Sequence, residues 1–352
     1  MSKEKIISLT DGLLNTANGK TTHGLIHGST RFQLCCVVDS ISVGKDAGEI
    51  LDGKKRNIPV FASVEQAMTQ LSEIPTTCVV GVATHGGILT ATLKEGLRSA
   101  ILAGLNIVNG LHSLVEEDPE LMNLAKAKGV SVLDIRKPKP YASLKAWEGE
   151  IYQVKTPRIA VMGTDCAIGK RTTAVMLYNL CNENKIKAQM VYTGQSGWMQ
   201  GFKYGFILDS TLNDFVSGEL EHAIVTCDKE TSPDLILIEG QSSLRNPSGP
   251  CGAEFICSGG ATGVILQHVP ERTHYNHGPN SHSKMPSLES EIALINMLGA
   301  TVIGICFNTK TDNILTEFQG IPVVRPRQQG VEALLPAIRA FLAKPKTSVY
   351  ED

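Results

Sequence analysis

The feature that most constrains this chain is a loop with two glycines and a lysine, placed between a strand-like and a helix-like segment. The apolar run RIAVM at 158–162 has the length of a buried strand, and TTAVMLYNLCNENK at 172–185 has helical spacing. Between them, GTDCAIGK at 163–170 supplies the glycines and the lysine of the G-x-x-x-x-G-K phosphate-binding motif. This order of strand, loop and helix predicts an α/β fold with a phosphate site at a sheet edge.

The chemistry of this loop predicts a ligand with at least two linked phosphates. Gly163 and Gly169 let the backbone curl so that successive amides point inward, and Lys170 adds positive charge where the helix begins. A polyphosphate or a pyrophosphate is therefore expected there, and an ordinary glycine-rich turn is the alternative. The predicted cofactor-binding residues of the loop are Gly163, Thr164, Asp165, Cys166, Ala167, Ile168, Gly169, Lys170, Arg171, Thr172 and Thr173.

One residue of the loop departs from the motif. Arg171 stands where the motif has the Ser or Thr hydroxyl that binds Mg²⁺, so magnesium coordination is in doubt. A guanidinium can neutralise phosphates directly and in a bidentate way, which suits a ligand such as coenzyme A, whose phosphates are not transferred. ATP with Mg²⁺ remains the alternative, and we assign no metal ligands.

The chain as a whole predicts two α/β domains. Its 352 residues exceed what one hydrophobic core usually organises. Short apolar runs alternate with amphipathic stretches from about residue 33 and again from residue 158, which is typical of βαβ units on a parallel sheet. A stretch with three prolines at 137–158 separates the halves. We expect a Rossmann-like parallel-sheet domain over residues 1–150 and a P-loop NTPase-like domain over residues 151–352.

Composition and charge narrow the class of partner. A net charge of -2 without a long basic stretch offers no footprint for nucleic acid or an anionic membrane. No segment approaches the roughly 20 apolar residues that span a bilayer, and the first residues lack a signal-peptide core. Nine cysteines, several in apolar runs, suggest no disulfide framework. We expect a cytoplasmic homo-oligomer that acts on a small molecule.

Two acidic residues are candidates for acid–base chemistry. Glu239 ends the buried-looking run LILIE at 235–239, where phosphate-loop proteins carry a second acidic motif. Its carboxylate could orient a metal-bound water, act as a general base or bond to local backbone, and these alternatives stay open. Asp209 ends the run FILD at 206–209 and is the second catalytic candidate.

A loop rich in histidine supplies further candidates. Residues 268–282 follow an apolar strand and hold four of the nine histidines, at spacings that match no common zinc site. We expect an acid–base role for His274 and a substrate-binding role for Arg272, against the alternative of a polar exposed loop. Arg245 is a third candidate, as a partner for substrate carboxylates.

Two other strand-end segments carry small polar groups. The segment TGQSGW at 193–198 follows a predicted strand, and its Gln195 and Ser196 are candidate substrate-binding residues. Asn308 ends the strand VIGICFN at 302–308, where an amide could bind a purine edge of the cofactor.

At GTDCAIGKRTT the chain resembles a two-domain family associated with D-glutamate N-acetyltransferases, and the likeness extends over nearly the whole sequence. The segments that carry it are VVDSISVGKDAGEIL at 37–51, IPVFASVEQA at 58–67, TGQSGW, DFVSGELE at 214–221 and IEGQSSL at 238–244. The GTD opening and the IEG segment also resemble dethiobiotin synthetase, a phosphate-loop enzyme that activates a carboxylated substrate with ATP.

The resemblance implies a reaction in D-amino-acid catabolism: acetyl-CoA and D-glutamate give N-acetyl-D-glutamate and free coenzyme A. On that basis the loop holds the coenzyme phosphates, Glu239 or Asp209 accepts a proton from the substrate ammonium, and Arg245 and Arg272 hold the carboxylates. The rival hypotheses are an ATP-dependent ligase or kinase acting on a small carboxylate, and a nucleotide-sensing module without turnover.

Overall fold

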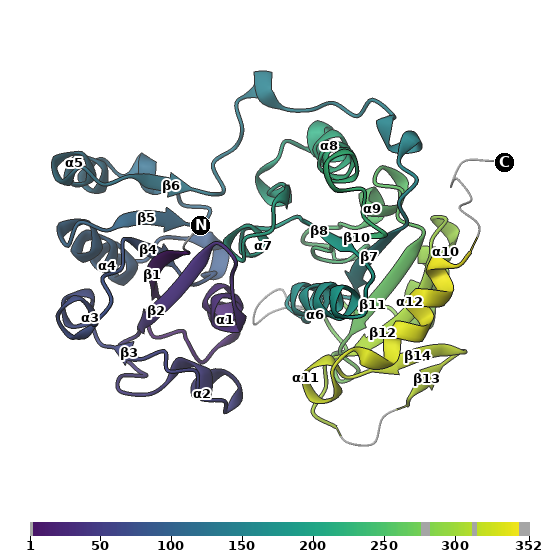
Figure 1. Ribbon diagram of the computed structural model, residues 1–352, viewed down its shortest axis with the longest axis horizontal. Coiled ribbons are helices and arrows are strands. Elements are labelled where there is room, and N and C mark those ends of the chain that lie inside the picture. The colour runs from purple at the N-terminus through teal and green to yellow at the C-terminus, as the bar shows by residue number, and fades with distance from the viewer. Residues whose placement is uncertain (1–2, 276–281, 312–314, 345–352) are drawn as a thin grey trace. The chain divides into compact units, whose positions relative to one another are not determined.

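The computed structural model describes residues 3–275, 282–311 and 315–344, and the chain divides into two compact units (Figure 1). Unit 1 comprises residues 1–138 and 195–202, and unit 2 comprises residues 139–194 and 203–352. None of the helices in the described ranges is long and apolar enough to cross a membrane.

Unit 1 is built on a parallel sheet of six strands in the order β3-β2-β1-β4-β5-β6, which is the strand order of Rossmann folds. This confirms the expected Rossmann-like architecture. The strands are β1 (Glu4–Leu9), β2 (Phe32–Val38), β3 (Val60–Phe61), β4 (Thr77–Val80), β5 (Asn106–Asn109) and β6 (Val132–Asp134). The helices are α1 (Lys20–His27), α2 (Ala47–Asp52), α3 (Val64–Gln70), α4 (Ala91–Leu102) and α5 (Pro119–Lys128).

The helices of unit 1 begin at side chains that cap them. Ser63 accepts a hydrogen bond from the third backbone amide of α3, and Thr90 does the same for α4. Asp118 caps α5, which has Pro119 in its first turn and ends at Gly129 with φ +67°. These local signals explain why this part of the chain could be predicted from its sequence.

β1, a central strand of the sheet in unit 1, comes before residue 33, where the predicted alternation of strands and helices begins. β1 pairs in parallel with β2 on one side and with β4 on the other, and Ile6 and Ile7 are fully buried. The run is short and follows a charged start, so its periodicity is weak by itself. Its place in the sheet is set by both neighbours, which lie far along the chain.

Unit 2 has an eight-stranded sheet in the order β13-β14-β12-β11-β7-β10-β8-β9, parallel except for the β13–β14 pair. The strands are β7 (Arg158–Gly163), β8 (Ala188–Tyr192), β9 (Tyr204–Gly205), β10 (Leu235–Glu239), β11 (Gly263–His268), β12 (Thr301–Phe307), β13 (Glu317–Phe318) and β14 (Ile321–Val324). The helices are α6 (Lys170–Glu183), α8 (Asn213–Thr231), α9 (Ala253–Cys257), α10 (Leu288–Met297), α11 (Pro326–Gln329) and α12 (Leu335–Leu342).

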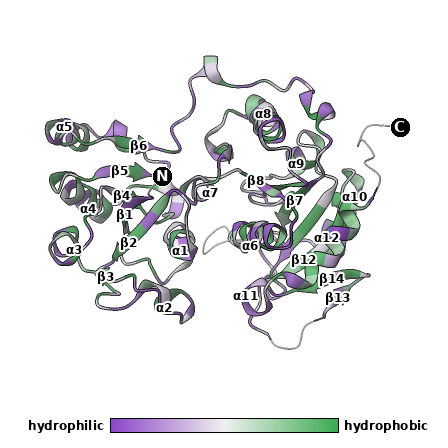
Figure 2. Cartoon of the chain, in the orientation of Figure 1, coloured by the Kyte–Doolittle hydropathy of each residue, from purple (hydrophilic) through white to green (hydrophobic). Residues whose placement is uncertain are grey.

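The core of unit 2 places the phosphate loop between two buried strands. β7 pairs with β10 and with β11, and the side chains of β10 from Leu235 to Glu239 are all buried. In Figure 2 the strands of this sheet are mostly green, whereas α6 and α12 carry both colours, as helices with one buried face do. The expected P-loop α/β domain is therefore present, and its loop starts from the interior of the sheet.

The two units divide the chain differently from the expected ranges 1–150 and 151–352. Residues 139–150 belong to unit 2, because two buried glutamates of α8 hold this stretch. Glu219 accepts hydrogen bonds from the Lys145 amide and the Lys139 ammonium, and Glu221 accepts hydrogen bonds from the amides of Glu148 and Ile151. The conformation of this proline-rich stretch is thus fixed by hydrogen bonds to side chains of α8.

Residues 195–202, which begin with the short helix α7 (Gln195–Met199), belong to unit 1 although unit 2 surrounds them in sequence. Met199 is fully buried in a cluster with Ile6 and Phe32, and its carbonyl accepts a hydrogen bond from the Ser29 hydroxyl at 2.7 Å. The Arg31 guanidinium lies 4.0 Å from the centre of the Trp198 ring. The segment predicted to be a substrate loop is therefore part of the core packing of unit 1.

Candidate functional site

The loop after β7 has the backbone conformation of an anion-binding turn. Five residues separate Gly163 from Gly169, one more than in the motif, so Thr164 stands at the position of the motif's first glycine. The Thr164 amide still pairs with the Gln267 carbonyl of β11 at 3.0 Å. Ala167 has φ +54° and Gly169 has φ +106°, which turn the backbone before α6 begins at Lys170. Such turns direct successive amides to one side.

The lysine of the loop is held close to the backbone. The Lys170 ammonium donates hydrogen bonds to the carbonyls of Asp165 at 2.6 Å and Ser242 at 2.7 Å. The residue is buried, which strengthens its field in comparison with an exposed lysine. Ser242 lies just beyond β10, so the positive charge lies between the loop and the neighbouring strand end.

Asp165 is the structural centre of the loop. Its fully buried carboxylate accepts hydrogen bonds from the Cys166 amide, from Asn246 Nδ2 at 2.9 Å and from Arg272 Nη1 at 2.7 Å. The same Arg272 nitrogen donates to the Cys166 carbonyl at 2.9 Å. These contacts fix the shape of the loop from two sides, so Arg272 braces it. Its predicted substrate contact stays a prediction, and Asn246 was not anticipated from the sequence.

Glu239 and Arg171 form a pair of opposite charges beside the loop. Glu239 is buried, and its Oε2 accepts a hydrogen bond from the Thr193 amide at 3.1 Å. Burial raises the pKa of Glu239, and the positive charge of Arg171 opposes this effect. Burial lowers the pKa of Arg171, and the charge of Glu239 opposes that effect in turn. A guanidinium only donates hydrogen bonds, so Arg171 supplies a fixed positive charge here and cannot ligate Mg²⁺.

His268, at the end of β11, is a neutral partner of the loop. Burial lowers its pKa to about 4, although the negative charges of Glu271 and Glu289 oppose the shift. Its Nδ1 lies 2.9 Å from the Thr164 hydroxyl. The histidine-rich composition of the segment gave a signal for this residue, but the contact with Thr164 depends on the pairing of β11 with β7.

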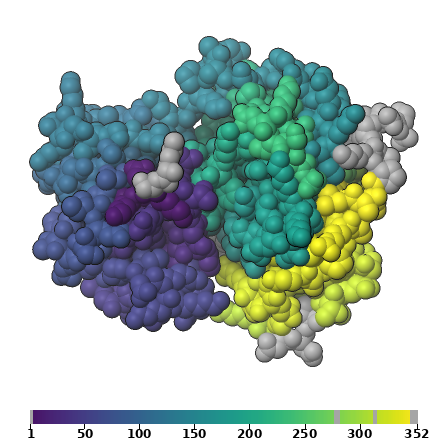
Figure 3. Space-filling model, in the orientation of Figure 1, coloured from purple at the N-terminus to yellow at the C-terminus, as the bar shows by residue number. Residues whose placement is uncertain are grey.

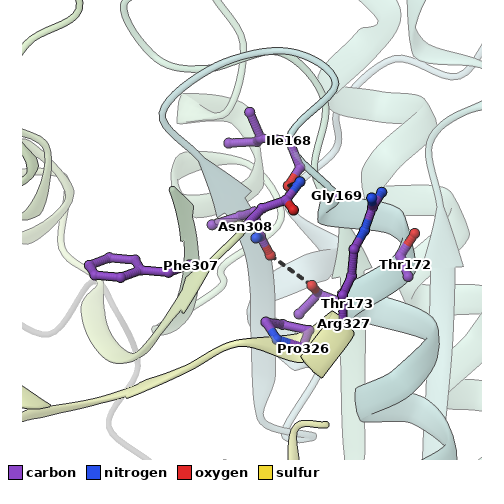
Figure 4. Close-up of a pocket in the computed structure, with 9 residues that line it drawn as sticks. Ile168, Gly169, Thr172, Thr173, Phe307, Asn308, Pro326 and Arg327 are labelled. Carbon is purple, nitrogen blue, oxygen red and sulfur yellow. Dashed lines mark hydrogen bonds between the residues drawn. The ribbon is translucent and has the colours of Figure 1, made fainter. Parts of the chain in front are cut away.

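A pocket opens at the start of α6 (Figure 4). The Asn308 amide nitrogen donates to the Ile168 carbonyl at 3.2 Å, which ties the end of β12 to the loop. Thr173 donates to the Gln267 side chain at 2.7 Å, the dashed contact in Figure 4. The predicted cofactor residue Asn308 therefore lies beside the phosphate loop. Ile168, Gly169, Thr172, Thr173, Gln267, Phe307, Asn308, Pro326 and Arg327 line the pocket.

Two predicted catalytic residues are exposed. Asp209 lies in a single 3-10 turn at 208–210, and His274 lies on the loop after β11, where its Nδ1 is 2.9 Å from the Thr273 hydroxyl. An exposed group stays hydrated, which makes both residues weaker candidates than Glu239 for proton transfer in a dry site. The rest of the histidine-rich loop at 276–281 lies outside the described residues.

The remaining predicted substrate residues have partners inside the protein. Arg245 donates two hydrogen bonds to the Glu291 carboxylate of α10, at 2.8 and 2.6 Å, and one to the Ser290 hydroxyl. Gln195 and Ser196 are buried in α7, and the Gln195 amide oxygen accepts a hydrogen bond from Arg136 at 2.9 Å within unit 1. Their roles toward substrate stay predictions.

The acidic, histidine and cysteine side chains of the described residues do not gather into a group of three or more that could hold a metal ion. All nine cysteines are present as free thiols. Burial raises the pKa of several of them, Cys251 beside Glu254 included, so these thiols stay protonated.

Family matches cover most of the chain. Residues 40–138 match the family described as a domain of unknown function (DUF1611_N) with a Rossmann-like domain, and residues 145–335 match DUF1611_C, described as a P-loop domain. The crystal structure of a DUF1611 family protein from Anabaena variabilis superimposes with a TM-score of 0.85 at 28% identity, covering 96% of this chain and all of that one.

Two curated proteins are similar in sequence. A D-glutamate N-acetyltransferase from a Pseudoalteromonas species is 31% identical over 276 residues, which is 74% of this chain and 80% of that protein. A D-glutamate N-acetyltransferase from Tritonibacter scottomollicae is 31% identical over 280 residues, which is 75% of this chain and 81% of that protein. These relatives support an acyltransferase function at the level of the family. The chain thus belongs to the DUF1611 family, in which it is related to D-glutamate N-acetyltransferases.

Proposed function

We propose that this protein transfers the acetyl group of acetyl-CoA to the amine of D-glutamate. The observation that carries the proposal is the place of Arg171, the second residue of α6 directly after Lys170, with the charge of Glu239 nearby. P-loop NTPases bind Mg²⁺ with a hydroxyl at the position of Arg171 and an acid near that of Glu239. A fixed guanidinium in this place favours a ligand whose phosphates are bound but not transferred, as coenzyme A is. We take D-glutamate as the substrate from the names of the two curated relatives.

The diphosphate of acetyl-CoA would bind at the start of α6. The backbone amides of the loop, the positive end of the helix and the Lys170 ammonium all favour anions at this point. Arg171 adds a second charge within one residue. The two negative charges of the diphosphate, spread over four oxygens, can therefore be neutralised by this chain's own groups.

Glu239 is the base in the proposed mechanism. Its carboxylate accepts a proton from the ammonium of D-glutamate, and the free amine attacks the thioester carbonyl carbon. The carbon–nitrogen bond forms, the carbon–sulfur bond then breaks, and the coenzyme leaves as a thiolate that takes up the second proton lost by the attacking nitrogen. Burial raises the pKa of Glu239, which makes its carboxylate a stronger base than an exposed one. Backbone amides other than those that hold the diphosphate would stabilise the oxyanion.

The second candidate function is an ATP-dependent ligase or kinase acting on a small carboxylate. In its favour, Glu239 ends the strand next to β7, as the metal-orienting acid of phosphate-loop enzymes does. Against it, the position of the Mg²⁺-binding hydroxyl is occupied by Arg171. This function would require an added divalent ion, whereas the acetyl transfer proposed above would not.

The test is the release of free thiol from acetyl-CoA by purified protein in EDTA. We expect thiol release with D-glutamate, none above background with L-glutamate, and one N-acetylglutamate formed per thiol by mass spectrometry. The Arg171→Ser variant is the matched comparison, because it restores the hydroxyl of the motif and should raise the KM for acetyl-CoA. ADP formation from MgATP with a carboxylate, without any thiol release, would contradict the proposal and support the ligase.

A further inference from the structure

The pocket at the start of α6 contains an arginine that the proposed chemistry does not use. Arg327 is exposed on α11, directly after Pro326, and it is the only charged side chain among the described residues that line the pocket. In Figure 4 its side chain extends past Thr172 toward Gly169. The space-filling view of Figure 3 shows the yellow surface of the last described helices directly beside the teal surface of the α6 region. The guanidinium is therefore accessible next to the phosphate loop.

The direction of a ligand through this pocket follows from the order of its lining residues. Phosphates would bind at Gly169 and Lys170, and the first turn of α6 continues with Thr172 and Thr173. The pocket is narrow but open to solvent, so a nucleoside joined to the diphosphate through its 5′ carbon would lie along its open side, past Asn308 and Pro326. The Asn308 carboxamide is oriented by its bond to the Ile168 carbonyl, so its oxygen can accept from a purine amino group. The ribose then passes Arg327.

We infer that Arg327 is a specificity residue that binds the 3′-phosphate of coenzyme A, an inference that rests on the proposed use of acetyl-CoA. Coenzyme A differs from ATP and ADP by a phosphomonoester on the 3′ oxygen of the ribose. That group carries between one and two negative charges at neutral pH and offers three acceptor oxygens, as other phosphomonoesters do. A guanidinium binds such a group through two parallel hydrogen bonds.

Neighbouring cations are less suited to this role because their contacts lie elsewhere. Arg325 donates to the Thr311 carbonyl at 2.9 Å and so belongs to the framework of the segment. Lys170 donates hydrogen bonds to the carbonyls of Asp165 and Ser242, and Arg171 interacts with the negative charge of Glu239. Arg327 alone combines exposure with a place in the lining of the pocket.

The experiment compares the binding of coenzyme A and 3′-dephospho-coenzyme A by calorimetry in EDTA, with wild-type protein and Arg327→Gln. We expect the wild type to bind coenzyme A about ten- to a hundredfold more tightly, the range of a hydrogen-bonded charge pair. In Arg327→Gln this ratio should fall to near one, while the affinity for the dephospho form stays unchanged. Arg327→Lys should keep part of the preference. Arg339→Gln, an exposed arginine of α12 outside the pocket, should keep all of it.

Three results would overturn the inference: no preference in the wild type, an undiminished preference in Arg327→Gln, or no binding of coenzyme A at all. Because binding is measured without D-glutamate, the outcome is separate from that of the acetyl-transfer assay. If the preference for coenzyme A over its dephospho form depends on Arg327 but the protein acetylates nothing, the proposed reaction is refuted and the role of Arg327 stands. If D-glutamate is acetylated equally well from acetyl-CoA and from acetyl-3′-dephospho-CoA, the role of Arg327 is refuted and the proposed reaction stands.

Discussion

At the scale of single residues, the loop combines groups that shape it with groups that could act on a ligand. The Asp165 carboxylate accepts hydrogen bonds from Cys166, Asn246 and Arg272, so its charge helps to fix the shape of the loop. Glu239 is buried, with positive charge nearby and with the backbone of Thr193 and Gly194 as hydrogen-bond donors to its carboxylate. Both acids sit next to a glycine-rich turn in the sequence, and only the structure distinguishes their roles.

The substitution Glu239→Gln tests the base. It removes proton acceptance but keeps the shape, so we expect kcat to fall by about 10² to 10⁴. Because burial raises the pKa of Glu239 in the folded state, the wild-type rate should fall as the pH drops through a value above the usual one for a glutamate. The same shift means that ionised Glu239 opposes folding at neutral pH, so the variant should unfold at the same or a higher temperature. A variant with full kcat would exclude Glu239 as the base.

The substitution Asp165→Asn tests whether the Asp165–Arg272 ion pair holds the shape of the loop. It leaves Arg272 without its carboxylate partner, and since Arg272 is partly exposed we expect a loss of about 1–3 kcal/mol in the free energy of unfolding. The KM for acetyl-CoA should rise while that for D-glutamate changes little. The matched control is Asp234→Asn, which alters an exposed aspartate of the same unit that accepts from the Lys187 amide. An unchanged unfolding curve in urea for Asp165→Asn would contradict the structural role.

At the scale of elements, the parts that could be predicted are those with local signals. The loop, α6 and the strands β7 and β10 follow from short apolar runs and from glycine and lysine at fixed spacing. The conformation of α7 could not be predicted, because its Met199 and Gln195 are held by Ser29 and Arg136, which are far away in sequence. The Arg245–Glu291 ion pair was missed for the same reason.

The glycine before α6 provides a test at this scale. A Cβ at Gly169 would meet the side-chain amide nitrogens of Asn308 and Gln267 at 3.8 Å, so there is space for a methyl group. The backbone, however, has φ +106°, a conformation that residues other than glycine rarely adopt. Gly169→Ala should therefore cost about 1–3 kcal/mol in the free energy of unfolding, or else turn the loop amides away and weaken the binding of coenzyme A. Gly249→Ala, with open space and no positive φ, is the control. Equal stability and equal affinity of the two variants would contradict the strained geometry.

At the scale of the whole molecule, the sequence predicts two α/β domains and the structure has two such units, but the chain passes between them more often than a single linker would require. Unit 1 takes residues 195–202 from the middle of the P-loop half. The buried glutamates Glu219 and Glu221 assign the proline-rich stretch to unit 2. Such exchanges depend on contacts between distant segments, and periodicity carries no information about them.

A fragment tests this organisation. Residues 1–150 alone lack α7, so Ile6, Leu25 and Phe32 would lose the buried Met199 from their cluster. We expect this fragment to bind a hydrophobic dye and to unfold at a lower temperature than unit 1 does in the full chain. Adding a peptide that spans residues 193–203 should partly restore the cooperative transition. A fragment that melts cooperatively without the peptide, at the temperature of the full chain, would contradict the inclusion of residues 195–202 in the core of unit 1.

The most direct test of the central claim is calorimetric titration of the protein with coenzyme A and with ATP, each in EDTA and in Mg²⁺. We predict that coenzyme A binds with the same affinity in both buffers, because Lys170 and Arg171 supply the positive charge, and that Lys170→Met abolishes this binding. ATP should bind more weakly than coenzyme A in either buffer. Tight binding of ATP that appears only with Mg²⁺, together with no binding of coenzyme A, would contradict the claim.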